Sequence, residues 1–237
     1  MVIPAANEER HLGRCLASVG AAREHLYRSG TSAAARVVAV LDGCRDGTAD
    51  IAAAFDGVEL VAINAGSVGT ARRAGAAAAL AATGCARRVW LANTDADSEV
   101  PVDWLTSMVT KARLGAHVVL GTVTPGGALC PAARAAWDSR HSLQEGHPHV
   151  HGANFGIRGD AYLALGGWQP FETGEDADLA TRAARAGLRI TRTGSIPVVT
   201  SVRRDGRAPR GFSSYLRALP SLDAQEGPPG RPWAGKA

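Results

Sequence analysis

The chain has 237 residues, of which 46% are hydrophobic and 20% charged, and its formal net charge is +4. This composition is typical of a globular protein and excludes a collagen-like or wholly disordered chain. The length suits one domain with a substantial core. No apolar run approaches the 18 residues of a membrane span, so the sequence predicts no transmembrane segment.

We expect a cytoplasmic location for two reasons. The chain opens directly on a strand-like segment, which predicts that no signal peptide precedes it. Its four cysteines form no Cys-x-x-Cys pair, so they indicate neither a zinc site nor a disulfide framework. Isolated thiols of this kind suit a reducing compartment.

The positive charge is concentrated at the C-terminal end. From Arg203 onward, seven Lys or Arg residues stand against three Asp or Glu. Such a segment suits a solvated tail, or a peripheral contact with a membrane surface or an anionic acceptor. A nucleic-acid partner is not expected, because no basic stripe with interleaved aromatic residues is present. Pro and Gly are frequent after residue 224, and we expect residues 218–237 to form a flexible tail.

Short apolar runs alternate with helical patterns along the first half of the chain. Continuous apolar runs predict strands, and amphipathic or Ala-rich stretches predict helices. The predicted strands are residues 2–3, 37–41, 58–63 and 89–92. The predicted helices are residues 11–27, 48–55 and 70–82, and a further one that begins at Pro101.

The second half contains more Gly- and Pro-rich turns. Helices are predicted at residues 132–143, at 159–165 and from the acidic cluster near residue 175 to about residue 186. Strands are predicted at residues 153–158, 189–192 and 196–201.

This alternation predicts an α/β fold with a mostly parallel sheet and helices on both faces. Ligands of such sheets bind at the carboxyl ends of the strands. Polar side chains follow three of the predicted strands at those ends, namely Asn7 with Glu8, Asp42, and Asp95 with Asp97. The sequence therefore predicts one site at this edge of the sheet.

Two acidic motifs indicate the chemistry of that site. Asp95 and Asp97 follow an apolar strand, and one or two such carboxylates hold Mg²⁺ together with substrate phosphates. Glu175 and Asp176 could supply a general base to the same cleft, although acidic residues also favour a helix N-terminus through its dipole. Together the motifs indicate metal-assisted transfer from a phosphorylated donor.

Five motifs stand in an order that resembles a known family. They are Val-Ile-Pro-Ala-x-Asn-Glu-Glu, Val-Leu-Asp-Gly-Cys-x-Asp-Gly-Thr, Asp-x-Asp, His-Gly-Ala-Asn-Phe-x-Ile-Arg and Gly-Glu-Asp-x-Asp-Leu. The chain resembles a family 2 glycosyltransferase with the GT-A fold of the nucleotide-diphospho-sugar transferases. The resemblance covers residues 1–217 and implies a single GT-A domain. Residues 1–123 would form the half that binds the nucleotide sugar, and residues 124–217 the acceptor-binding and catalytic half.

The resemblance implies a metal-dependent, inverting glycosyltransferase that uses Mg²⁺ or Mn²⁺. The enzyme would move one sugar from a UDP- or GDP-type donor to a hydroxyl of a small-molecule, glycan or lipid-linked acceptor. Asp176 would be the catalytic base with Glu175 in support, and Asp95 and Asp97 would hold the metal. The residues implied for nucleotide binding are Pro4, Ala5, Asn7, Glu8, Asp42, Gly69, Arg72 and Asp95.

Trp168, His151 and Asn154 are implied on the acceptor side. Trp168 fits either an apolar platform under a sugar ring or a core aromatic residue. His147, His149 and His151 alternate, and imidazole suits zinc, but no cysteine or paired carboxylate lies nearby in sequence. We expect a loop near the acceptor, with His151 facing the cleft, rather than a zinc site.

Three features depart from the family pattern. Ala6 stands where many members have an aromatic residue or His, and the membrane helices of processive synthases are missing. No His follows His151 as a late metal ligand; the matching stretch contains Arg203 and Arg204, which could neutralise phosphate charge instead. Two other functions stay open: a sugar-phosphate nucleotidyltransferase, although residues 4–9 contain no Gly or basic residue, and a non-catalytic nucleotide-sugar-binding relative.

Overall fold

The computed structural model describes residues 1–81 and 83–203. Arg204, the last part of the expected domain and the expected flexible tail at residues 218–237 lie outside this range. Within it, no helix has the length and apolar character needed to cross a membrane.

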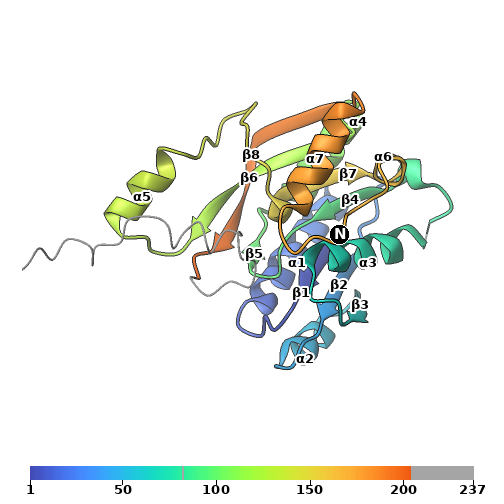
Figure 1. Ribbon diagram of the computed structural model, residues 1–237. Coiled ribbons are helices and arrows are strands. Elements are labelled where there is room, and N and C mark those ends of the chain that lie inside the picture. Colours follow the sequence, from blue (N-terminus) through green and yellow to red (C-terminus); the bar gives the residue numbers. More distant parts are fainter. Residues whose placement is uncertain (82, 204–237) are drawn as a thin grey trace, which may run out of the picture.

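Four parallel strands build the first half of the sheet (Figure 1). These strands are β1 (Val2–Ala5), β2 (Val37–Asp42), β3 (Val58–Ile63) and β4 (Trp90–Asn93). The helices that connect them are α1 (Leu12–Arg28), α2 (Thr48–Ala53) and α3 (Val68–Ala81), with a 3-10 turn, η1 (Ala86–Arg88), before β4. Every residue of β2 is buried, as its continuous apolar run predicts.

The second half extends the same sheet with mixed pairing. The remaining strands are β5 (Ser98–Glu99), β6 (Val118–Gly126), β7 (Phe155–Arg158) and β8 (Ile190–Ser201). The full strand order is β3-β2-β1-β4-β7-β6-β8-β5. β7 pairs antiparallel with both β4 and β6, whereas β6 and β8 are parallel. The helical elements of this half are α4 (Trp104–Arg113), α5 (Pro131–Asp138), η2 (Gly152–Asn154), α6 (Gly159–Ala164) and α7 (Glu175–Arg185).

Helices cover both faces of the sheet and form a core on each. One core contains buried side chains of α1, α4 and α5, and the other contains those of α3, α6 and α7. Neighbouring residues of one strand enter opposite cores: Ile3 packs into the first and Val2 into the second. Two buried cores on one sheet confirm the predicted α/β class with helices on both faces.

The structure differs from the predicted elements at several places: β5 was not predicted, the helix predicted at residues 132–143 ends at Asp138, and the first residues of the strand predicted at 153–158 belong to the 3-10 turn η2. β6 was not anticipated, and the expected division near residue 123 falls inside this strand. The two short strands predicted after α7 are one long strand, β8, whose pairing with β6 shifts register between Gly121 and Val123. The helix predicted from Pro101 begins at Trp104, because residues 102 and 103 form a turn in which the Pro101 carbonyl accepts from the Trp104 N–H.

Candidate active site

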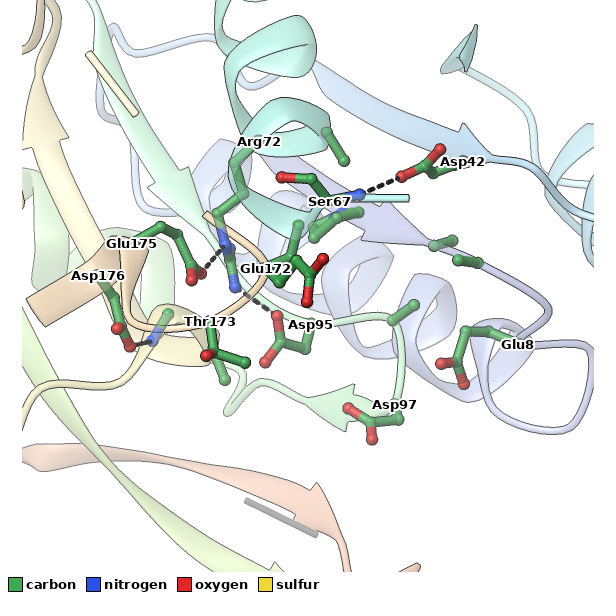
Figure 2. A pocket seen from close by; sticks show the side chains of 18 of the residues that line it. Glu8, Asp42, Ser67, Arg72, Asp95, Asp97, Glu172, Thr173, Glu175 and Asp176 are labelled. Atoms are coloured by element: carbon green, nitrogen blue, oxygen red, sulfur yellow. Dashed lines mark hydrogen bonds and ion pairs between the residues drawn. The ribbon is translucent and has the colours of Figure 1, made fainter. Parts of the chain in front are cut away.

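A cleft of about 780 Å³ opens at the carboxyl ends of β1, β2 and β4. Its lining combines loops that follow these strands with the N-terminal turns of α3 and α7 and the segment before β7. The sequence-predicted residues that line it are Pro4, Ala5, Asn7, Glu8, Asp42, Arg72, Asp95, Asp97, His151, Glu175 and Asp176. The structure thus brings the two acidic motifs, about eighty residues apart in sequence, into one cavity (Figure 2).

Arg72 joins these two motifs. Its side chain projects from the first turns of α3, and its Nε donates to Glu175 Oε1 at 3.1 Å while its Nη2 donates to Asp95 Oδ1 at 2.5 Å (Figure 2). The Arg72 guanidinium also lies 5.5 Å from the ring centre of Trp168. Only 1% of Arg72 is exposed. The guanidinium therefore fixes two carboxylates, since a buried charge needs partners, and its expected contact with phosphate stays a prediction.

Asp95 and Asp97 lie on the loop after β4, with Glu8 nearby on the loop after β1 (Figure 2). Burial and the neighbouring charge of Asp95 raise the pKa of Asp97 to about 7, although Arg203 opposes this shift. Arg203 Nη2 lies 3.0 Å from Asp97 Oδ2, and the same guanidinium binds both oxygens of Glu8. The site is therefore rich in carboxylates that are stabilised by a cation.

Glu175 and Asp176 form the first turn of α7, which Gly174 introduces in the left-handed conformation at φ 83°. Asp176 Oδ2 accepts a hydrogen bond from the Gly152 N–H at 2.7 Å, and Oδ1 accepts from the Ala177 N–H at 2.7 Å. Burial raises the pKa of Asp176 despite these bonds. Burial also raises the pKa of Glu175, against the opposing charge of Arg72. Two fixed carboxyl groups with raised pKa values are suited to proton transfer.

Asp42 organises a loop of the cleft wall. Its Oδ1 accepts from the Ala65 and Gly66 N–H groups at 2.6 and 3.1 Å, and its Oδ2 accepts from the Ser67 N–H at 3.2 Å. The predicted role in binding the nucleotide base stays a prediction. The structure adds a second role, because these three bonds hold the turn that leads into α3.

Three predicted site residues lie elsewhere. Trp168 is 0% exposed and packs into the core with Phe155, at 5.1 Å between ring centres, so it is no platform for a sugar ring. Asn154 is also 0% exposed, because its amide binds the Trp104 indole and two backbone carbonyls. Gly69 does not line the cleft; an added Cβ there would meet the Gln169 carbonyl oxygen. These three residues therefore stand outside the lining of the cleft.

The three alternating histidines, His147, His149 and His151, have different surroundings. His151 lines the cleft, as expected, while His147 is 2% exposed and its Nε2 lies 3.2 Å from the carbonyl oxygens of Leu120 and Thr193. His149 Nε2 accepts from the Ser142 N–H at 3.0 Å. In the described part of the chain, no three His, Cys, Asp or Glu side chains are placed to share a metal ion. The histidines therefore form no preassembled zinc site there.

Comparison with known proteins gives the family. A family model described as Glycosyl transferase family 2 matches residues 1–162. The chain belongs to this family. Among curated protein sequences, nothing matches significantly.

Solved structures share the fold. Mannosyltransferase PcManGT from Pyrobaculum calidifontis, in complex with GDP-Man and Mn²⁺, aligns with a TM-score of 0.57 at 21% identity, covering 91% of this chain and 67% of that one. TarS from S. aureus aligns with a TM-score of 0.57 at 14% identity, covering 84% of this chain and 59% of that one. Glucosyl-3-phosphoglycerate synthase from Mycobacterium tuberculosis, with Mg²⁺ and uridine-diphosphate, aligns with a TM-score of 0.54 at 18% identity, covering 81% and 67%. This family 2 chain thus spans 59% of TarS as solved, and at these identities the likeness concerns the fold.

The cleft also contains residues that were not predicted from the sequence. Glu172, Thr173 and Ser67 line the cleft. The Ser67 hydroxyl and the Gly69 N–H both donate to the Phe171 carbonyl, at 3.0 and 3.1 Å. This pair of bonds fastens the loop before α7 onto the start of α3. Glu172 and Thr173 had one signal in the sequence, their position directly before the Gly-Glu-Asp motif, whereas Ser67 belongs to none of the five motifs.

Proposed function

We propose that this family 2 protein is a metal-dependent, inverting glycosyltransferase that moves one sugar from a nucleoside-diphosphate donor to an acceptor hydroxyl. The observation that carries the proposal is the placement of Asp176 in the same cleft as the Asp95–Asp97 pair, with Arg72 binding both acidic motifs. The Asp95–Asp97 motif can hold a metal ion at the leaving diphosphate, while Asp176 can accept the proton of the attacking hydroxyl.

The residues fit a divalent metal ion of the Mg²⁺ or Mn²⁺ type. Magnesium is held in proteins by one or two carboxylates together with substrate phosphates and water. Asp97, whose raised pKa reports burial and the nearby Asp95 charge, gains from an additional cation. When bound, such an ion neutralises the charge that grows on the departing diphosphate. Asp97 would hold it directly, with Asp95 in support.

In the proposed transfer one proton moves, one bond forms and one bond breaks. Asp176 removes the proton of the acceptor hydroxyl, and that oxygen bonds to the anomeric carbon of the donor sugar. The bond from this carbon to the diphosphate breaks, and its electron pair leaves with the nucleoside diphosphate. A single displacement of this kind inverts the anomeric configuration. A positioned carboxylate base contributes roughly 10²–10⁴-fold to such a rate.

The loops after β1, β2 and β3 are proposed to hold the donor nucleotide. Pro4, Ala5, Asn7, Glu8 and Asp42 line this side of the cleft. Asn7 adopts a left-handed conformation at φ 48°, and its Oδ1 accepts from the Arg45 N–H at 2.5 Å, so the two loops are joined. His151 and the segment before β7 line the cleft on the side of α7, where the acceptor would bind.

Thermal unfolding with UDP, GDP, dTDP and CDP, each with and without Mn²⁺, tests the donor site. A ligand at a hundredfold excess over its dissociation constant stabilises a fold by about 2.7 kcal/mol. We expect a Mn²⁺-dependent shift with one diphosphate, and its loss in Asp97→Ala. The absence of a shift with all four nucleotides would contradict the donor-site proposal.

The donor that stabilises the fold then allows a product test. We expect release of the nucleoside diphosphate and a product of inverted anomeric configuration, as read by proton NMR of the anomeric signal. Release of pyrophosphate would instead identify a nucleotidyltransferase, and retained configuration would contradict the single displacement.

A further inference from the structure

The guanidinium of Arg203 lies against Asp97, the carboxylate that is proposed to hold the metal ion. Its Nη1 donates to Glu8 Oε2 at 2.6 Å and its Nη2 donates to Glu8 Oε1 at 2.7 Å. The same Nη2 lies 3.0 Å from Asp97 Oδ2. Glu8 follows β1, Asp97 follows β4 and Arg203 follows β8, so one guanidinium joins the ends of three strands.

The sheet itself delivers Arg203 to this place. β8 pairs with β5, which begins directly after Asp97, and the Ser201 N–H donates to the Asp97 carbonyl at 3.0 Å. The Ser98 and Thr200 hydroxyls lie 2.9 Å apart across this pair. Arg203 is therefore held within two residues of a backbone bond to the metal loop. The position of Arg203 is therefore set by the pairing of β8 with β5, unlike that of a mobile side chain on the protein surface.

The ion pairs are also shielded from water. The Glu8 side chain is 9% exposed, that of Asp97 is 12% exposed and that of Arg203 is 31% exposed. Exposed ion pairs are worth little, whereas a forked guanidinium on a buried carboxylate is a strong, directional contact. Removing one partner of such a group leaves charge buried without compensation. Glu8 and Asp97 thus depend on a cation even when no substrate is bound.

Building on the proposed metal-dependent function, we propose that Arg203 is an internal competitor of the metal ion at Asp97. The guanidinium and a divalent ion use the same lone pairs of Asp97 Oδ2, and two cations this close repel each other. Binding of the metal and release of Asp97 by Arg203 are therefore coupled. Glu8 retains the guanidinium at the edge of the cleft while Asp97 turns to the metal.

Through this coupling Arg203 is a positioning residue. It lies in the stretch where many family members have a His that binds the metal. In the free enzyme it keeps Asp97 and Glu8 paired and weakens metal binding. A donor diphosphate adds negative charge to the cleft and shifts this balance toward the metal. The ion is thereby recruited together with the donor rather than before it.

The test measures Mn²⁺ affinity directly, from the electron paramagnetic resonance signal of free Mn²⁺ titrated with the full chain without nucleotide. We expect Arg203→Gln to lower the Kd about tenfold, since a positive charge beside the ion is lost. Arg203→Lys keeps the charge and should stay close to the native value. Arg45→Gln is the matched control, because exposed Arg45 lines the same cleft, and among the described residues no carboxylate pairs with its side chain. It should change the Kd less than twofold.

A second arm locates the effect at Asp97. In an Asp97→Asn background, Arg203→Gln should no longer tighten Mn²⁺ binding, because the shared ligand is gone. Arg203→Met, a neutral variant with an apolar stem, repeats the comparison if Arg203→Gln melts below the assay temperature.

Three outcomes overturn the proposal. If the Kd for Mn²⁺ is unchanged or higher in the folded neutral variants, Arg203 does not compete with the metal. If Arg45→Gln lowers the Kd as much as Arg203→Gln does, the lower Kd reflects only the change in net charge. Absence of Mn²⁺ binding by the native chain, even with saturating UDP or GDP, removes metal dependence itself and so rejects the proposed function as well. The Kd of the native chain thus separates failure of this inference from failure of the function.

Discussion

At the scale of single residues, Arg72 determines how the acidic motifs sit relative to each other. Its buried guanidinium contacts Asp95 from the loop after β4 and Glu175 from α7. The side chains of Arg72 and Glu175 are 2% and 6% exposed. A carboxylate this far from water is stable in its charged form only with such a partner. The Arg72 guanidinium therefore stabilises the fold and holds the two acidic motifs of the proposed site together.

Arg72→Met is expected to cost about 3–5 kcal/mol of unfolding free energy, because it leaves two carboxylates without their cation. Urea unfolding followed by circular dichroism measures the loss. Arg134→Met is the matched control: Arg134 pairs with Asp138 on the surface of α5, where the two side chains are 59% and 55% exposed. Such a surface pair is worth less than about 1 kcal/mol. Equal losses in the two variants would contradict a stabilising role of the buried Arg72 guanidinium.

Asp176→Asn is expected to lower kcat roughly 10²–10⁴-fold, because an amide cannot accept the proton of the acceptor. Binding of the nucleoside diphosphate with Mn²⁺ should stay near the native value. Asp178→Asn is the control on the same helix; Asp178 pairs with Arg182 and is not part of the cleft lining. Native turnover in Asp176→Asn would show that another group is the base.

The pH dependence of the reaction follows from the same residue. Burial raises the pKa of Asp176, so its carboxylate form is lost on acidification at a higher pH than for an ordinary Asp, near 3.9. The acidic limb of the kcat/KM profile is therefore expected above pH 4. A profile that stays flat down to pH 4 would contradict the assignment.

At the scale of elements, α3 lies close to the sheet because glycine occupies the contact. An added Cβ at Gly75 would lie 2.5 Å from Val2 Cγ1 and 2.8 Å from Val40 Cγ2. Ala71 and Ala76 are buried in the same core, so the helix presents small residues to the strands. This close approach brings the first turns of α3, and with them Arg72, up to the cleft.

Gly75→Ala is therefore expected to destabilise the fold by about 1–3 kcal/mol through overpacking. Gly20→Ala is the matched control in the interior of α1, where an added Cβ meets no atom of residues 1–81 and 83–203 within 4 Å. That change should stabilise the fold by about 0.5–1 kcal/mol through helix propensity. Denaturant midpoints of the two variants on either side of the native value would support this packing; stabilisation by Gly75→Ala would contradict it.

At the scale of the whole molecule, a stack of histidine rings lies between the cleft and β8. His151 and His149 lie 5.9 Å apart between ring centres, and His149 and His147 lie 5.7 Å apart. Burial lowers the pKa of His151 to about 3, with the other histidines adding to the shift. The folded protein therefore keeps His151 neutral at a pH where the unfolded chain binds a proton.

This difference makes stability depend on pH. Between about pH 6.5 and 3 the unfolded state binds more protons at His151, so the unfolding free energy falls as pH falls, by up to about 1.4 kcal/mol per pH unit. Above pH 6.5 both states are neutral and the effect ends. His151→Asn should reduce the slope by close to one proton, as measured by urea unfolding at stepwise pH. The same reduction in His25→Asn, an exposed position in the last turn of α1, would contradict a specific role for His151.

The sequence by itself determined the alternating elements of the first half and the edge of the sheet that carries the site. Residues 58–63 were predicted with the bounds that β3 has, because a local apolar run signals a strand, although no residue of β3 is fully buried. Asp42, Asp95 and Asp97 were placed correctly at strand ends, since parallel strands end at a common edge. These features depend on neighbours in sequence, which a pattern can register.

Only the tertiary structure decided what each side chain faces. Trp168 and Asn154 were expected on the acceptor side of the cleft, yet both are buried, since their surroundings come from β7, α4 and β8. Arg72 was expected at phosphate, a role that stays a prediction, and it also joins two carboxylates that lie eighty residues apart in sequence, Asp95 and Glu175. Arg203 reaches Glu8 across 195 positions of sequence. Contacts over such separations are fixed by strand order and packing, and no local pattern of residues encodes them.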